Sequence, residues 1–314
     1  MLYWRLLMAT FLERYQAGDR VAVWDELVAL GEGVRHKLYY ADAVAVAAET
    51  MRRARHNVEL LIQRLAEAGY RFIPPEDDYA LDKGYTPGLL EKQIAAGQAA
   101  ALQAQSEEAA RRIQERVARL AAMIDEQQAA LAARQAKVAE ALKKPPLENP
   151  DVFDPPNSKT AAWFKKIEKA AGGPMPISLR AWYEQVGGVS LNGSHPEINP
   201  RESPEPWYPA DPLMVTPLRD LVEMLDIIPG EDGGIGLLIA PDYLMKANTS
   251  GSDPYTIAVP NACADARLAE EWHKTTFVKY LRIAFQWGGF PGWMRNKKRP
   301  REALAKLAEG LLPI

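Results

Sequence analysis

The sequence predicts an α+β protein: a helical N-terminal bundle, a long Ala-rich helix, and a C-terminal mixed α+β domain with a small sheet. Three observations predict this class. Apolar residues between Ala41 and Leu65 recur at intervals of three and four, as on one face of a helix. The stretch from Leu89 to Leu142 contains no proline and a single glycine. The C-terminal half then carries short apolar runs that are closed by prolines.

We expect residues 1–72 to form the helical bundle. Two short helices are predicted over roughly 2–16 and 20–32, because Gly18 separates them and further glycines end the second. The third helix, over 41–65, has arginines between its apolar positions, so one face should pack on its neighbours. Residues 73–88 mix prolines, glycines and acids without a period, which indicates a loop.

Residues 89–142 are predicted to form a long helix that resembles a coiled coil. In heptad register one row stays apolar, whereas a second row turns polar at Gln127 and Arg134. Three arrangements stay open: a helix folded back on the bundle, a coiled coil between chains, and a lone projecting helix. The residues expected to mediate oligomerisation are Ile113, Val117, Leu120, Ile124, Leu131 and Val138.

Residues 143–156 hold five prolines in fourteen positions, which predicts a linker without helix or central strand. Residues 157–314 should follow as the α+β domain. Two short helices are expected first, one ending at Gly172 and one capped by Ser178. Four strand-like runs come next: Val189–Leu191, Leu213–Thr216, Leu237–Ala240 and Tyr255–Val259.

A further short helix is expected to begin at Pro217 with Thr216 as its cap. Residues 265–287 return to helical spacing and end at two glycines. This order of elements indicates a sheet covered by helices and does not match a βαβ nucleotide-binding unit.

Composition excludes several classes of function. The net charge of -3 gives no basic excess, so nucleic acid is an unlikely partner. The single cysteine, Cys263, excludes an internal disulfide and a multi-cysteine zinc site, which suits the cytoplasm. Residues 1–12 are apolar, but Arg5 interrupts them, so we expect an amphipathic helix and no signal sequence. No apolar run approaches 18 residues, so no membrane span is expected.

No nucleotide-binding, metalloprotease, nucleophile-elbow or paired-cysteine motif occurs, so we predict no catalytic residue, no metal site and no cofactor. A loose set of His195 with Glu197, Asp211 and Asp242 leaves an unrecognised hydrolase as a third alternative. The basic run at 295–301 is most simply a solvated surface.

Charge is distributed unevenly in the C-terminal half. Residues 195–242 contain ten acidic residues and two arginines, whereas residues 267–301 are basic. The two segments either neutralise each other or leave an acidic face for a basic partner. Large aromatic residues in a proline-rich loop suit a binding surface. The expected partner-binding residues are Glu197, Glu202, Glu205, Trp207, Tyr208, Asp211, Glu231 and Asp232.

Two stretches carry a family resemblance: PMPISLRAWYEQVGGVSLNG at 174–193 and FVKYLRIAFQWGGFPG at 277–292. The first resembles the proline-led helix, Gly-Gly turn and first strand of the SUKH superfamily, and the second its closing helix. This superfamily includes bacterial toxin-immunity proteins and fungal cell-wall-assembly regulators. The resemblance covers roughly 157–293 and implies a non-enzymatic module that binds proteins, often nuclease or deaminase toxins.

We therefore expect a bacterial protein-binding module, possibly of the immunity type, carried on a helical oligomerisation stem. Its partner would be another protein, possibly a basic toxin or nuclease domain. The main alternative is a structural scaffold that assembles through the long helix. Self-association through that helix is expected in both cases.

Overall fold

The computed structural model is a mixed α+β structure with a helical N-terminal region, as the sequence predicts. Its residues form two compact units, one of Met1–Pro74 with Pro145–Ile314 (the main unit) and one of Pro75–Lys144 (the hairpin unit). No helix in the described part of the chain combines the length and the apolar character that a membrane crossing needs. The structure describes residues 9–72, 88–104, 106–200, 209–225, 234–247, 249 and 251–314.

The first helices among the described residues of the main unit are α2 (Phe11–Ala17), α3 (Arg20–Ala29), η1 (Gly31–Arg35) and α4 (Tyr40–Glu67). Thr10 and Glu13 form a capping box at the start of α2, and Gly18 ends it in the left-handed conformation at φ 117°. The predicted helix over 41–65 is confirmed as α4.

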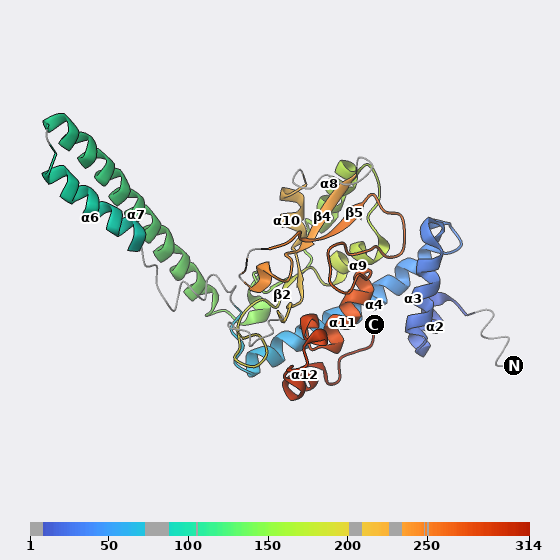
Figure 1. Cartoon of the computed structure of the whole chain (residues 1–314). Helices are drawn as coiled ribbons and strands as arrows, with labels where there is room; N and C mark the ends of the chain where they lie inside the picture. Colours follow the sequence, from blue (N-terminus) through green and yellow to red (C-terminus); the bar gives the residue numbers. More distant parts are fainter. Residues whose placement is uncertain are drawn as a thin grey trace. The chain divides into compact units, whose positions relative to one another are not determined.

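The C-terminal part adds short elements to the same unit. They are η2 (Pro146–Glu148), β1 (Phe153–Asp154), α8 (Thr160–Ala171), α9 (Ile177–Gln185), β2 (Gly188–Ser190), β3 (Met214–Val215), α10 (Leu218–Glu223), β4 (Ile235–Ala240), η4 (Met245–Ala247), β5 (Tyr255–Val259), α11 (Phe277–Gln286), η5 (Pro291–Arg295) and α12 (Arg301–Ala308). Figure 1 shows α4 running through this unit, where it contacts α2, α9, η2 and α12.

The described strands form two antiparallel sheets, β1-β2-β3 and β4-β5. Val189 of β2 pairs with Phe153 of β1 on one side and with Val215 of β3 on the other. In the second sheet Leu237 pairs with Ile257. The four predicted runs are therefore confirmed as β2 to β5, although they are divided between two sheets.

The proline-rich stretch 143–156 differs from the expected linker. From Pro145 onward it belongs to the main unit, and Val152 and Phe153 are buried in the core. The same stretch supplies β1, which pairs with β2 along one side. Prolines follow β1 at once, so the strand is short and lies at a sheet edge, where proline is tolerated. The assignment of residues 157–314 to a domain of their own stays a prediction.

The predicted helix over 265–287 is shorter in the structure, since α11 begins at Phe277. The residues before it form turns and isolated bridges, and Ala269 exchanges two backbone hydrogen bonds of 3.3 and 2.8 Å with Thr256. Ser178 also differs from its predicted role as a cap. It lies inside α9, where its hydroxyl donates to Asp265 at 2.7 Å.

The single long helix predicted over 89–142 is two helices, α6 (Gly88–Leu102) and α7 (Glu107–Ala141). Ser106 caps α7 by accepting the backbone N–H of Ala109 at 3.2 Å, and two glutamates occupy the first turn. The two helices pack against each other across this short connection (Figure 1). The start of α7 at Ser106 was not predicted, because the residues on both sides are Ala-rich and favour a helix.

Candidate functional site

Of the predicted partner-binding residues, Glu197 and Asp211 lie in the described part of the chain. Glu197 is exposed, and its backbone N–H donates to Nδ1 of His195 at 3.2 Å. The neighbouring Ile198 is buried and holds this loop against the core. The other members, Glu202, Glu205, Trp207, Tyr208, Glu231 and Asp232, lie outside the described residues.

Asp211 is not on the surface, which corrects its expected role in partner binding. Its side chain and that of Lys246 are both fully buried, with 2.6 Å between Asp211 Oδ1 and Lys246 Nζ. The hydroxyl of Tyr255 donates to the second carboxylate oxygen at 3.2 Å. The sequence shows Asp211 as one acid among ten, whereas Lys246 lies 35 positions away and gives no local sign of the pair.

The surroundings of this ion pair favour a structural role. The ammonium of Lys246 lies 4.7 Å from the centre of the Tyr255 ring. Burial raises the pKa of the Tyr255 hydroxyl, and the Asp211 charge raises it further, so the hydroxyl stays protonated and donates. Each charge thus has a partner inside the core, which a buried ion pair requires.

The side chains of His195 and Asp242, which the hydrolase alternative uses, accept hydrogen bonds from backbone N–H groups of their own turns. His195 Nδ1 accepts backbone N–H groups from Glu197 and Ile198, at 3.2 and 3.3 Å. Asp242 Oδ1 accepts those of Leu244 and Met245. No hydrogen bond between described residues joins His195 to Asp211 or Asp242. Within the described ranges no three His, Cys, Asp or Glu side chains gather as metal ligands.

Cys263 is half-buried, and burial raises the pKa of its thiol. A raised pKa reduces the fraction of thiolate, which is the reactive form.

Two arginines of the basic run at 295–301 contact aromatic rings. Arg295 lies over Trp272 and Arg299 over Trp287, with 5.0 and 4.9 Å from guanidinium carbon to ring centre.

The predicted oligomerisation residues all lie on α7. Ile124 is 7% exposed, and it is the one buried residue among the described side chains of α6 and α7. Gly97 of α6 lies opposite Val117, because a Cβ added to the glycine would be 2.6 Å from Val117 Cγ2. The half-buried members of the row are Ile113, Val117, Leu120, Leu131 and Val138.

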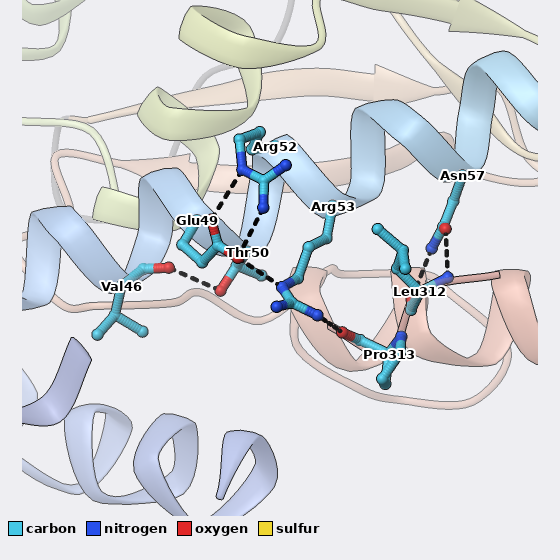
Figure 2. A network of polar contacts seen from close by, with 8 residues as sticks. All are labelled: Val46, Glu49, Thr50, Arg52, Arg53, Asn57, Leu312 and Pro313. Atoms are coloured by element: carbon cyan, nitrogen blue, oxygen red, sulfur yellow. Dashed lines mark hydrogen bonds and ion pairs between the residues drawn. The ribbon is translucent and has the colours of Figure 1, made fainter. Parts of the chain in front are cut away.

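A polar network that the sequence did not predict lies along α4 (Figure 2). Glu49 accepts two hydrogen bonds from Arg52, at 2.8 and 2.9 Å, and one from Arg53 at 2.7 Å. Hydrogen bonds from Arg52 hold the pKa of the Glu49 carboxyl below its ordinary value, and Arg53 adds to this effect.

Asn57, one turn further along α4, is fully buried and contacts Leu312. One signal in the sequence points to it. Asn57 falls on the apolar face between Ala54 and Leu61, where a polar side chain needs a partner.

Comparisons of the chain with models of protein families, with curated proteins and with solved structures find no match. The resemblance to the SUKH superfamily therefore stays an expectation.

Proposed function

We propose that this chain is a cytoplasmic, non-enzymatic protein-binding protein that self-associates through the hairpin unit. A binding role of the immunity type, as the family resemblance implies, is part of this proposal. The observation that carries it is the poor burial of the α6–α7 pair.

The hairpin unit has little core of its own. Ile124 is its one buried residue among the described side chains, although α7 alone has 35 residues. Ordering each residue costs about 1–2 kcal/mol of backbone entropy, which burial of apolar surface must offset. A two-helix pair with one buried side chain does not meet this cost by packing, so an additional surface on α7 would stabilise it.

The geometry supports α7 as the place of that surface. At 1.5 Å per residue α7 is about 52 Å long and α6 about 22 Å. Since Gly97 lies opposite Val117, the part of α7 that carries Leu131 and Val138 extends past the start of α6. Within the hairpin unit, α6 packs on α7. A second copy offers the same apolar row and completes a helical bundle.

The test is the mass of the full chain in solution. Replacing Ile124 and Leu131 together by Asp places charge in the apolar row, so the mass from light scattering should fall to that of one chain. The matched control replaces Ala122 and Ala129 by Asp, which keeps the spacing and the charge but uses exposed positions. A native chain that is already a monomer at all concentrations would refute self-association.

Partner binding is proposed for the acidic stretch, of which Glu197 is a described and exposed member. An acidic face attracts the cationic surface with which a nuclease holds its substrate. Co-purification from cells that make the protein would identify the partner. Charge reversal at Glu202 and Glu205 should then slow association and weaken its salt dependence. If association with that partner is unchanged, the acidic stretch is not the binding surface.

A further inference from the structure

The segment after α12, residues 309–314, begins with a turn at Glu309 and Gly310, and its remaining residues lie against α4 and α11 without helix or strand structure. Asn57 holds its middle through two reciprocal hydrogen bonds (Figure 2). The Asn57 amide nitrogen donates to the carbonyl of Leu312 at 2.8 Å, and its oxygen accepts the backbone N–H of Leu312 at 2.7 Å. The asparagine thus presents to Leu312 the same donor and acceptor that a neighbouring β-strand would present.

Three arginines extend this contact along the backbone. Arg64 donates to the carbonyls of Leu307 and Glu309, and Arg53 donates to that of Pro313. Arg282 of α11 donates to the backbone oxygen of Ile314 at 2.9 Å. We call these four side chains, Arg53, Asn57, Arg64 and Arg282, the backbone clamp.

The clamp recognises main-chain atoms and leaves selection to the apolar side chains. These hydrogen bonds to the segment all go to its main-chain atoms. Of the segment's own residues Ile314 is buried at 4% exposure, whereas Leu311 and Leu312 are half-buried and Pro313 is exposed. A peptide of other sequence therefore makes the same polar contacts if it is extended and has an apolar residue at the position of Ile314.

Two of the clamp residues also have contacts outside the segment, Arg53 with Glu49 and Arg282 with the carbonyl of Arg20 at 3.5 Å. Arg53 is fixed by its 2.7 Å ion pair with Glu49, which Arg52 also contacts. Release of the segment does not require these pairs to break. The outer bonds of Arg53 and Arg64 to residues 313 and 309 are exposed to solvent, where water replaces them at little cost. Gly310, at φ 66°, provides a left-handed hinge in open space.

We propose that the clamp face of α4 and α11 is a peptide-binding groove, which segment 309–314 occupies in this structure. When the segment leaves, the groove accepts an extended apolar segment of another protein. This inference does not depend on self-association of the hairpin unit, whose residues take no part in the groove.

The experiment uses a chain that ends at Ala308 and a fluorescent peptide of residues 309–314. The peptide should bind the shortened chain and raise the fluorescence anisotropy, whereas the full chain, whose groove is filled, should bind far less. A peptide with an N-methyl group on the Leu312 amide lacks the N–H that Asn57 accepts. This peptide should bind the shortened chain about tenfold or more weakly than the parent peptide. The Asn57→Leu variant should bind the parent peptide with a similar loss of affinity.

A shortened chain that keeps its native circular dichroism but binds no peptide would overturn the proposal. Equal binding of the parent and N-methylated peptides would overturn it as well. If the shortened chain does not fold, a protease site between Glu309 and Gly310 provides the second test. After cleavage the segment should exchange with excess labelled peptide, and a segment that never exchanges would mean that it is a fixed part of the core.

Discussion

Helices α4 and α7 are the two longest described helices of the chain, yet they are stabilised differently. Both have a helical period and a high alanine content, and both were expected as helices. Eleven of the 28 residues of α4 are buried, including Met51, Val58 and Leu61. On α7 the described side chains include one buried residue, Ile124. Helical period alone therefore does not show how much of a helix is covered.

The two helices differ in the elements that pack against their apolar faces. The face of α4 packs on α2, α9 and α12, and it also carries the fully buried Thr50 and Asn57. These polar residues have partners within the same unit, since Thr50 donates to the Val46 carbonyl and Asn57 binds Leu312. The row of α7 meets α6 for part of its length. An interior helix depends on tertiary contacts, whereas an uncovered helix depends on propensity, capping and further partners.

The largest expected effect is a loss of stability at α4. Leu61→Ala should lower the free energy of unfolding of the main unit by about 2–5 kcal/mol, because it leaves a cavity in a closed core. The matched variant Ile124→Ala should leave that transition unchanged. Tryptophan fluorescence in urea separates the two units, since all eight tryptophans lie outside Pro75–Lys144. Equal shifts from both variants would mean that the units do not unfold separately.

A smaller effect is expected at Asp265, which joins the N-terminal helices to the C-terminal part. Its carboxylate accepts Ser178 Oγ at 2.7 Å, the Val278 backbone N–H at 3.2 Å and Trp24 Nε1 at 3.4 Å. Asp265→Ala leaves these buried donors without an acceptor, at about 1–3 kcal/mol in urea unfolding. Asp265→Asn keeps one acceptor oxygen and should cost less than Ala. If the two variants are equally stable, the hydrogen bonds do not contribute.

The pH dependence of this site has a defined sign. Burial raises the pKa of the Asp265 carboxyl above its ordinary value of 3.8. Its contribution to stability is therefore full below 3.8 and is lost as the pH rises through the folded-state pKa. The stability difference between the native chain and Asp265→Ala should be larger at acidic pH than at neutral pH. Urea titrations of both proteins across this range would measure it.

Several local elements were predicted from the sequence, whereas their partners were not. The bounds of α4 and the runs that became β2 to β5 follow from apolar spacing and nearby glycines or prolines. Asp211 was misassigned, because its partner Lys246 is distant in the chain and burial is a tertiary property. The proline-rich stretch 143–156 was expected as a linker, but the buried Val152 and Phe153 attach it to the main unit. The break before Ser106 was concealed by good helix formers on both sides.

The smallest expected effect concerns how closely α6 approaches α7. Alanine is favoured over glycine inside a helix by about 1 kcal/mol, so Gly97→Ala would stabilise an isolated α6. In the hairpin unit its Cβ would be 2.6 Å from Val117 Cγ2, so the Val117 side chain or the two helices must shift, which loosens their packing. Gly97→Ala should therefore reduce the protection of α6 amides in hydrogen exchange of the full chain.

The same change should have the opposite sign once Val117 is shortened. Val117→Ala removes the γ-methyl group that the new Cβ would meet, so Gly97→Ala in that background should gain the propensity term and raise protection. The two single variants and the double variant form a cycle whose coupling measures the contact directly. Because the contact is between small groups, we expect a coupling on the order of 1 kcal/mol. Additive effects would mean that α6 does not rest on Val117 in solution, and that the hairpin unit is more open than its two packed helices indicate.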